Sequence, residues 1–393
     1  MMSKRATVLC LSGLSLLGLA GCAEKNLYDC YQGALDADER RDCIATGKAD
    51  VTVEAGGSIS QAMFDMPAEA TRWVIKVRPG IYRETVAIDR SGVMLVGATS
   101  ADNPEERVII EGALDGGKKR KDAVIVSGSR FVMDGITMRN FSGNGVTVSK
   151  SIGVTLRNLV ADKTGHYGVY PVESEDILVE GCTTSGIDDA GIYVGQSRRA
   201  TVRGNHVFGN VAGIEIENTV TALVENNDVH DNTAGIMAFV LPNNPSKEGR
   251  DCTIRNNKTY RNNGKNFADP NAFVAKLPYG IGIGIMAADN TVVEKNEIYD
   301  NSSTGVALIG LQLFFTDPTK LDVEPNSDRA RITGNTYRGN GKAPDPAYVN
   351  GAPVKLLGAD VMWDSTGQGN CIDEPQGGEL KTDGAAAALP RCK

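Results

Sequence analysis

The chain has 393 residues, with 41 Lys and Arg against 49 Asp and Glu, and a formal net charge of −8 at pH 7. This acidic balance argues against nucleic acid as a partner, because binding nucleic acid depends on neutralising phosphates with basic side chains. Three histidines and no Cys/His cluster in the sequence give no reason to expect a metal ion or another cofactor.

Residues 1–21 have the pattern of a bacterial lipoprotein signal peptide. A basic start is followed by an apolar segment, residues 6–18, that is too short to span a bilayer. The segment ends in Leu-Ala-Gly-Cys, which resembles a lipobox, so we expect Cys22 to become the lipidated first residue of the mature chain. Because Ala23 is not the aspartate associated with inner-membrane retention, we expect anchoring in the outer membrane of the cell envelope. A plain secretory signal with a chance cysteine is the alternative.

Export to an oxidising compartment permits disulfides. Four cysteines form two couples that are close in sequence, and pairing within each couple is the simplest connectivity: Cys30 with Cys43, and Cys371 with Cys392. The first couple lies in a linker, residues 22–50, that follows the signal peptide. Cys182 and Cys252 fall inside the repeat described below, and we expect them to be buried thiols.

A short helix is expected near the start of the folded body, which we place at residues 51–342. The apolar residues at positions 59, 62, 63 and 66 would share one face of a helix over residues 58–66. Ser58 and Gln61 form a plausible capping box, and Pro67 would stop the helix. Because the end of a stack of strands exposes an apolar cross-section, this helix is expected to cap it. Strand-like runs follow at residues 73–77, 85–88, 93–96 and 107–110.

A glycine stands directly before an aliphatic residue seven times, at a nearly constant interval. The pairs are Gly145-Val146, Gly168-Val169, Gly191-Ile192, Gly213-Ile214, Gly235-Ile236, Gly282-Ile283 and Gly305-Val306. The steps between successive glycines are 23, 23, 22, 22, 47 and 23 residues, and the long step is close to two ordinary steps joined by an insertion. A period in this range indicates a solenoid of stacked units.

Each period contains three short strands. A second apolar strand centre follows each glycine: Leu156, Val179, Val202, Val224, Ile254, Val293 and Ile332. A third strand accompanies a pair of asparagines five residues apart: Asn205/Asn210, Asn227/Asn232, Asn257/Asn262, Asn296/Asn301 and Asn335/Asn340. Three strands per coil without helical spacing predict an all-β, right-handed, single-stranded parallel β-helix, because parallel crossovers are overwhelmingly right-handed. The asparagines are expected to stack as hydrogen-bonded ladders.

The outward side chains of the glycine-led strands should line up from coil to coil. Alternation in the strand after Gly213 directs Ile214 and Ile216 into the bore and Glu215 and Glu217 outward. The first outward column reads Thr147, Tyr170, Tyr193, Glu215, Met237, Gly284 and Ala307. The second column reads Ser149, Val172, Gly195, Glu217, Phe239, Met286 and Ile309. One end of this face is aromatic and acidic, and the other end is apolar.

Three insertions should wall the apolar half of this face into a trough. They lie near residues 242–249, 264–279 and 311–326, two along one edge of the sheet and one along the other. The floor of the trough would be Met237, Phe239, Met286 and Ile309. We expect the aromatic residues of the insertions to cover this floor, and an open binding slot is the alternative: Phe267, Phe273, Tyr279, Phe314 and Phe315. From about residue 343 to residue 393 the repeat is lost, and this segment should cap the other end of the solenoid.

The polar residues at the mouth of the trough are the candidates for chemistry. We expect them to be accessible: His166, Tyr170, Asp188, Asp189, Tyr193, Gln196, Glu215 and Glu217. Glu215 and Glu217 should be roughly 6.8 Å apart along their strand, inside the range for an inverting carboxylate pair, and Asp188 and Asp189 could join them. Proton abstraction from a uronate by a histidine or tyrosine of this set is a second chemistry. Alternatively, the acids make turns, the tyrosines only stack, and an aromatic ladder binds sugar rings without catalysis.

The repeat and its leader resemble a known superfamily. The segment Gly-Ile-Tyr-Arg-Glu-Thr-Val-Ala-Ile at residues 80–88 and the coils after it look like the exported right-handed β-helix proteins: pectin lyases, polygalacturonases, pectin esterases, mannuronan C5-epimerases and NosD-type periplasmic proteins. This resemblance covers about residues 50–342. Residues 167–171, 189–197 and 213–218 look more like a bacterial lipoprotein family named only for its parallel β-helix repeats.

The enzyme signatures of this superfamily are matched only in part. Residues 167–172 keep the frame of the epimerase signature Tyr-Gly-Phe-Asp-Pro-His, but Tyr170 and Val172 stand at its acid and histidine positions. Asp188-Asp189 resembles the paired acids of polygalacturonases, whereas His166 is not followed by the glycine of their Gly-His-Gly. The resemblance therefore implies an exported carbohydrate-related fold without assigning catalytic residues.

These patterns predict an envelope lipoprotein that binds a polysaccharide on the glycine-led sheet and leave open whether it modifies the polysaccharide as a polyuronate lyase, an epimerase or a hydrolase. The expected substrate-binding residues are Tyr170, Tyr193, Gln196, Met237 and Phe239. The candidate catalytic residues are Glu215, Glu217, Asp188, Asp189 and His166. The alternative function is a non-catalytic scaffold whose apolar trough docks a partner protein in the cell envelope.

Overall fold

The computed structural model of the chain describes residues 26–31, 37–98, 107–113, 121–315, 317–350, 358–373 and 388–393. The expected signal peptide, residues 1–21, and the expected lipidation site, Cys22, lie outside these residues. The chain divides into two compact units, residues 1–48 and residues 49–393. Within the described ranges, the chain contains no helix whose length and apolar character would let it cross a bilayer.

The first unit contains a 3-10 helix, η1 (Leu27–Tyr31), and an α-helix, α1 (Ala37–Thr46). The expected disulfide between Cys30 and Cys43 joins them, with the two Cα atoms 5.7 Å apart. A helix of this size is marginal by itself in water, and the disulfide together with the bridge between Asn26 and Lys48 constrains it.

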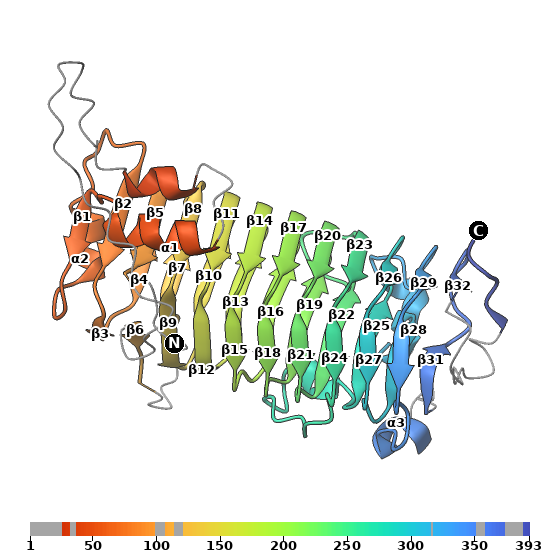
Figure 1. Ribbon diagram of the computed structural model, residues 1–393. Helices are drawn as coiled ribbons and strands as arrows, with labels where there is room; N and C mark the ends of the chain where they lie inside the picture. Colours follow the sequence, from red (N-terminus) through yellow and green to blue (C-terminus); the bar gives the residue numbers. More distant parts are fainter. Residues whose placement is uncertain are drawn as a thin grey trace, which may run out of the picture. The chain divides into compact units, whose positions relative to one another are not determined.

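The second unit is the predicted parallel β-helix, and every strand pairs in parallel with the equivalent strand of the next coil (Figure 1). The glycine-led sheet contains β4 (Val86–Ile88), β7 (Val124–Val126), β10 (Val146–Ser149), β13 (Tyr167–Val172), β16 (Ala190–Gly195), β19 (Ala212–Glu217), β22 (Ala234–Phe239), β25 (Ile281–Met286), β28 (Thr304–Ile309) and β31 (Ala359–Trp363). The second sheet contains β1 (Val51–Val53), β2 (Trp73–Val77), β5 (Val93–Gly97), β8 (Phe131–Asp134), β11 (Ile152–Arg157), β14 (Glu175–Glu180), β17 (Arg198–Arg203), β20 (Val220–Glu225), β23 (Arg250–Arg255), β26 (Val292–Glu294), β29 (Arg331–Thr333) and β32 (Cys371–Asp373). The third sheet contains β3 (Gly80–Tyr82), β6 (Val108–Glu111), β9 (Ile136–Phe141), β12 (Val160–Thr164), β15 (Thr183–Ser185), β18 (His206–Phe208), β21 (Asp228–His230), β24 (Lys258–Tyr260), β27 (Glu297–Tyr299) and β30 (Thr336–Arg338).

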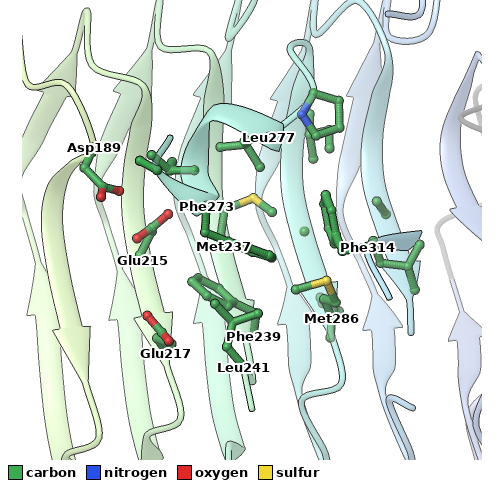
Figure 2. A pocket seen from close by; sticks show the side chains of 18 of the residues that line it. Asp189, Glu215, Glu217, Met237, Phe239, Leu241, Phe273, Leu277, Met286 and Phe314 are labelled. Carbon is green, nitrogen blue, oxygen red and sulfur yellow. The ribbon is translucent and has the colours of Figure 1, made fainter. Parts of the chain in front are cut away.

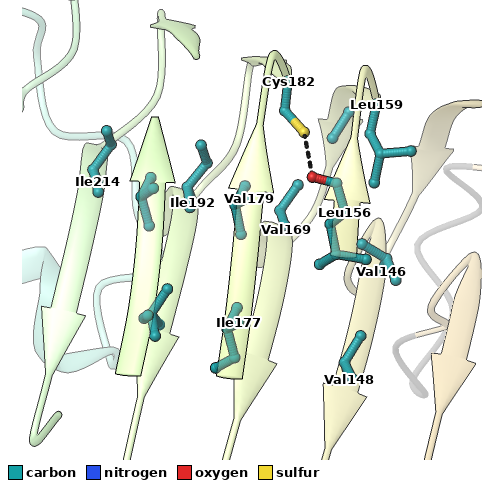
Figure 3. Packing of buried hydrophobic residues seen from close by; sticks show 14 of the residues in the cluster. Val146, Val148, Leu156, Leu159, Val169, Ile177, Val179, Cys182, Ile192 and Ile214 are labelled. Carbon is teal, nitrogen blue, oxygen red and sulfur yellow. Dashed lines mark hydrogen bonds between the residues drawn. The ribbon is translucent and has the colours of Figure 1, made fainter. Parts of the chain in front are cut away.

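The bore of the solenoid is filled by rows of aliphatic side chains, one residue from each coil. Ile214 and Ile216 point into it as expected, and both are almost fully buried. The predicted centres of the second strands form a single row in register from Leu156 to Ile332. Figure 3 shows part of this core, where the buried Cys182 thiol donates a hydrogen bond to the Leu156 carbonyl at 3.6 Å. Cys252 is likewise a buried thiol.

The repeated glycine is required because a side chain at that position would enter the crowded corner beside the third strand. At Gly213 an added Cβ would lie 2.6 Å from a Val229 methyl and 2.7 Å from the Gly235 carbonyl. These separations are shorter than van der Waals contact, so even alanine would force the coils apart. The glycine period in the sequence therefore records a steric limit of the stacked coils.

Two asparagine ladders flank the strands of the third sheet, one just before and one just after each strand. In the first ladder each side-chain amide and backbone N–H donates to the Oδ1 atom of the asparagine one coil further on, from Asn205 to Asn335. The second ladder runs in the same way from Asn210 to Asn340 and ends on Asp360 Oδ1, at 2.9 Å. These asparagines are buried, and each satisfies backbone groups that strand pairing leaves free, which confirms their structural role.

The N-terminal cap is α2 (Ile59–Phe64), whose Ile59, Ala62 and Met63 side chains are buried. The Ser58 hydroxyl accepts a hydrogen bond from the Gln61 backbone N–H at 3.1 Å, as the capping box predicts. The reciprocal half of the box is different, because the Glu84 carboxylate accepts from the backbone N–H groups of residues 59 and 60. A carboxylate at a helix N-terminus is favourable, so Glu84 from the next coil satisfies two further N–H groups of the first turn, while the Gln61 side chain donates to Asp65.

The segment after residue 342 keeps more of the repeat than its spacing suggested. It contains a short helix, α3 (Pro346–Asn350), and then β31 and β32, which extend the glycine-led and second sheets by one more coil. The predicted disulfide between Cys371 and Cys392 joins β32 to the C-terminal residues. Residues 390 and 391 contact β32 through a hydrogen bond from the Ile372 backbone N–H to the Pro390 carbonyl and an ion pair of Arg391 with Asp373.

Candidate functional site

The two outward columns of the glycine-led sheet form as predicted. Tyr193 pairs with Glu215, and Glu215 with Met237, while Gly195, Glu217 and Phe239 pair in the neighbouring column. The ring centroids of Tyr170 and Tyr193 are 5.0 Å apart. The coils therefore bring the aromatic and acidic side chains of β13, β16 and β19 together on one surface.

The three insertions meet one another over this face. The loop at residues 242–249 contacts the loop at residues 311–326 through an ion pair of Lys247 with Asp322 and a hydrogen bond from the Asn243 N–H to the same carboxylate. The loop at residues 264–279 reaches across from the other edge, where the rings of Phe273 and Phe314 have centroids 5.4 Å apart. The placement of the loops along both edges is confirmed.

The loops cover the apolar floor but leave a cavity of about 310 Å³ beneath them. The floor residues Met237, Phe239, Met286 and Ile309 are each less than a tenth exposed. Phe314 and Phe315 pack on this floor as expected, whereas Phe267 is half exposed and does not. In the described part of the chain there is thus no open apolar trough. The alternative function, docking of a partner protein, depends on such a trough.

One end of the cavity is acidic, and the rest is lined by apolar side chains (Figure 2). Asp189, Glu215 and Glu217 line the acidic end, and Figure 2 shows Met237, Phe273 and Met286 further along. No lysine or arginine is among the described residues that line the cavity. Three carboxylates therefore share a small volume whose described wall offers His166 but no lysine or arginine.

Tyr167 completes the aromatic part of the site, which the sequence analysis assigned only to Tyr170 and Tyr193. Its ring stacks on Tyr170 with centroids 4.4 Å apart, and it lies 4.6 Å from Tyr193 and 4.3 Å from His166. The sequence contained the information needed to predict this position. Tyr167 directly precedes the repeated glycine, and in the next coils the same position holds Ala190 and Ala212, which also face outward.

Tyr193 and Glu217 are held by a short chain of hydrogen bonds. The Tyr193 hydroxyl donates to Glu217 Oε2 at 2.7 Å, and the Gln196 amide donates to the same hydroxyl at 3.0 Å. Asn244, from the loop at residues 242–249, donates to Glu217 Oε1 at 2.6 Å. Gln196 therefore positions Tyr193 and does not line the cavity, and Asn244 is a site residue that sequence reasoning missed.

The absence of a side chain at Gly195 makes this arrangement possible. An added Cβ at Gly195 would lie 2.2 to 2.4 Å from atoms of the Tyr193 ring, so the ring occupies the space above the glycine. From there its hydroxyl reaches Glu217 in the next coil. The Tyr193–Glu217 contact thus depends on a glycine in the second outward column.

Glu215 is buried with a raised pKa. It is only 6% exposed, and this burial raises the pKa of its carboxyl well above the ordinary value, with the charges of Asp189 and Glu217 adding to the effect. Burial also raises the pKa of Glu217, but the hydrogen bonds from Tyr193 and Asn244 oppose that rise. The expectation that both glutamates are accessible at an open mouth is wrong, because the loops shield them from bulk water.

His166 lies beside the paired aspartates. Its Nδ1 atom is 3.5 Å from Asp189 Oδ2 and 3.9 Å from Asp188 Oδ1. His166 and Asp189 line the cavity, whereas Asp188 is half buried outside it. Of the predicted polar residues, His166, Asp189, Glu215 and Glu217 come together in the cavity, while Tyr170 and Tyr193 lie behind its wall.

The tyrosines are poorly suited to act as bases. Burial raises the pKa of Tyr170 to about 12, and burial with the nearby carboxylates raises the pKa of Tyr167 and of Tyr193 well above the ordinary value. A tyrosinate that removes a proton from a sugar carbon would need the opposite shift. The geometry supports aromatic stacking by these residues and acid–base chemistry by the carboxylates.

Comparison with known proteins agrees with the fold. Residues 107–244 match the family described as right handed beta helix region. A protein of Arabidopsis thaliana described as probable pectinesterase/pectinesterase inhibitor 6 is 32% identical over 186 residues, which are 43% of this chain and 29% of the plant protein. The match therefore spans less than a third of the length of that relative.

Solved structures that resemble this chain cover most of it. The A-module of the mannuronan C-5 epimerase AlgE6 of Azotobacter vinelandii has a TM-score of 0.56 and 16% identity, over 94% of this chain and 99% of the module. The alginate lyase of Paenibacillus sp. str. FPU-7 has a TM-score of 0.52 and 15% identity, over 81% of this chain and 100% of the lyase. A tailspike protein mutant of E. coli bacteriophage HK620, in complex with a pentasaccharide, has a TM-score of 0.55 and 10% identity, over 92% of this chain and 66% of the tailspike. At these identities the likeness establishes the fold alone.

Proposed function

We propose that this chain, a right-handed parallel β-helix protein of the pectin lyase-like class, binds a carbohydrate at the acidic and aromatic end of its roofed cavity. The observation that carries the proposal is Tyr167, which lines the cavity together with Glu215 and Glu217 and is held in place by stacking on Tyr170. Aromatic faces pack against sugar rings, and carboxylates accept hydrogen bonds from sugar hydroxyls. The mannuronan, alginate and pentasaccharide in the names of the similar structures favour the same ligand class.

The charge of the site favours a neutral or amino sugar over a uronate. Asp189, Glu215 and Glu217 converge in the cavity, and its described lining contains no lysine or arginine to pair with a uronate carboxylate, while His166 already lies 3.5 Å from Asp189. Bringing another carboxylate into this low-dielectric space is costly without such a partner. The apolar remainder of the cavity suits an acyl group or another apolar substituent of the sugar.

The carboxylates also support acid-catalysed cleavage of a glycosidic bond. Burial raises the pKa of Glu215, which favours the protonated carboxyl that a general acid needs to protonate the leaving oxygen. Glu217 accepts hydrogen bonds from Tyr193 and Asn244, which favour its charged form. It is therefore the better candidate to take a proton from the water that attacks the anomeric carbon. Their spacing of roughly 6.8 Å along the strand falls in the range of inverting enzymes.

Binding is tested by calorimetry on the full chain carrying Cys22→Ser, titrated with neutral, amino and uronic oligosaccharides. We expect a neutral or amino oligosaccharide to bind and Tyr167→Ala, which removes the tyrosine that lines the cavity, to weaken its affinity at least tenfold. Tyr299→Ala is the matched control, since Tyr299 belongs to another aromatic stack on the third sheet. Equal loss in both variants, or binding of uronic oligosaccharides alone, would contradict the proposal.

Catalysis is tested separately by release of reducing ends from any oligosaccharide that binds. We expect Glu215→Gln and Glu217→Gln each to lower the rate by about 10²–10⁴-fold while binding persists. Glu294→Gln, on the second sheet, should leave the rate unchanged. Binding without release of reducing ends in the unsubstituted chain would restrict the function to binding.

The location we propose is the cell envelope, with a lipid anchor on Cys22. The lipobox-like sequence at residues 19–22 supports the anchor, and the disulfides Cys30–Cys43 and Cys371–Cys392 fit an oxidising compartment. Mass spectrometry of the N-terminal peptide from membranes should find an acylated Cys22. An unmodified peptide that begins elsewhere in the soluble fraction would refute the anchor.

A further inference from the structure

Two histidines that are distant in sequence meet on the third sheet, away from the cavity lining. His206 begins β18, and β21 of the next coil carries Asp228 and His230. The strands pair in register, so His206 stands opposite Asp228 and Phe208 stands opposite His230. The ligand atoms of His206, Asp228 and His230 all lie within 4.8 Å of one another.

The two imidazoles face each other through their Nε2 atoms, which are 2.9 Å apart. For a metal ion bound to both nitrogens at about 2.0–2.1 Å, this separation corresponds to an N–metal–N angle of about 90°. A tetrahedral ion would hold the nitrogens about 3.3–3.4 Å apart. The observed spacing therefore matches adjacent positions of a square-planar or octahedral ion.

The orientation of His230 is fixed from outside the cluster. Its Nδ1 atom lies 2.7 Å from Asp231 Oδ2, and Arg261 donates to both oxygens of Asp231, at 3.1 and 2.8 Å. A carboxylate in this position selects the Nδ1–H tautomer and leaves the lone pair on Nε2 to bind a metal ion. The rings of Phe208 and Tyr260 flank the imidazole, with centroid distances of 5.5 and 4.8 Å.

Asp228 supplies an oxygen that protein groups do not satisfy. Its Oδ1 atom is buried and has no hydrogen-bond partner among the described residues. A buried carboxylate oxygen without a donor is costly unless a cation or a donor joins it. It lies beside two imidazole nitrogens, which are the ligands that transition metals prefer.

We propose that His206, Asp228 and His230 bind a divalent first-row transition-metal ion at an outer face of the solenoid. Two nitrogens at about 90° and one carboxylate oxygen suit Cu²⁺ or Ni²⁺. The Irving–Williams order predicts that Cu²⁺ binds more tightly than Ni²⁺. His206 is exposed, so the remaining coordination positions open to solvent or to another ligand. This site is independent of the carbohydrate proposed for the cavity.

The test uses the full chain carrying Cys22→Ser, stripped with a chelator and titrated with Cu²⁺, Ni²⁺ and Zn²⁺ by calorimetry. We expect one tight Cu²⁺ per chain and an electron paramagnetic resonance spectrum with two coordinated nitrogens. His206→Ala and His230→Ala should each weaken binding at least hundredfold, and Asp231→Asn should weaken it about 10–100-fold through the orientation of His230.

His166→Ala is the matched control, because His166 lies in the turn before β13 of the glycine-led sheet, and it should bind Cu²⁺ as the parent chain does. If His230→Ala fails to fold, the exposed His206→Ala still decides the question, with circular dichroism confirming its fold. Cu²⁺ binding that survives both histidine substitutions, or a spectrum with a single nitrogen, overturns the proposal. In that case the 2.9 Å contact is a hydrogen bond between two neutral histidine tautomers.

Discussion

Replacing Asn257 by alanine tests how far the asparagine ladders stabilise the solenoid. Asn257 Oδ1 accepts from the backbone N–H and the side-chain amide of Asn227, at 3.0 and 2.9 Å. Its own amide donates to the Val224 carbonyl at 2.9 Å and to Asn296 Oδ1 at 3.0 Å. The substitution removes all four bonds in the middle of a buried row.

The cost follows from which groups lose their partners. The Asn227 amide keeps a second bond to the Val202 carbonyl, and Asn296 Oδ1 keeps the backbone N–H of residue 257. The Asn227 backbone N–H is left without its partner, at about 1–3 kcal/mol, and each of the other three bonds contributes about 0.5–1.5 kcal/mol net. We therefore expect Asn257→Ala to lower the free energy of unfolding by about 2.5–7.5 kcal/mol.

Equilibrium unfolding in urea measures this change. Trp73 and Trp363 lie in coils at opposite ends of the solenoid, so their fluorescence, compared with circular dichroism, shows whether the coils unfold together. Asn271→Ala, at an exposed loop position, is the control and should change stability by less than about 0.5 kcal/mol. A loss of less than about 1 kcal/mol for Asn257→Ala would show that the ladder is not a main source of stability.

Three further predictions concern the pH dependence and the cysteines. Because the folded-state pKa of Glu215 is raised, its contribution to stability is fully present below the unfolded carboxyl pKa of about 4.3 and is lost as pH rises toward the folded-state value. Glu215→Gln should therefore become more stable than the parent chain as pH rises, by up to about 1.4 kcal/mol per pH unit in urea titrations, whereas parallel curves would contradict the raised pKa. Burial raises the pKa of Cys182 and of Cys252 to about 12, so neither thiol should react with iodoacetamide at pH 8 until the chain is unfolded, and mass spectrometry of native protein would reveal any exception. Replacing both Cys371 and Cys392 by serine should cost about 3 kcal/mol and speed hydrogen exchange in β32, and unchanged exchange there would mean that the tie is not needed.

The acidic end of the cavity distinguishes this protein from a simple stack of coils. Neighbouring coils place tyrosine, glutamate and methionine at one position of the outward column, so the environment changes over the spacing of one strand. The loops then remove water from the glutamates, and burial gives Glu215 its raised pKa. The covering loops thus change the chemistry of the outward residues beneath them.

The sequence by itself determined the solenoid, because a period of 22 or 23 residues must repeat the same local structure in every coil. Stacking in parallel register then fixes which side chains are neighbours, so the column from Tyr170 to Met237 and the asparagine ladders could be predicted from spacing alone. Both disulfides could also be predicted, because each joins two cysteines that are close in the sequence. These features depend on local geometry and on a single stacking rule.

The tertiary structure decided what the insertions do and which side chains meet across coils. Nothing in the repeat specifies the path of a loop, so the burial of Glu215 and the bond from Asn244 to Glu217 could not be predicted. His206 and His230 occupy different positions in their coils, and they meet only because side chains on adjacent strands reach diagonally. Side-chain reach and loop path are properties of three-dimensional packing, and the spacing of residues along the chain does not contain them.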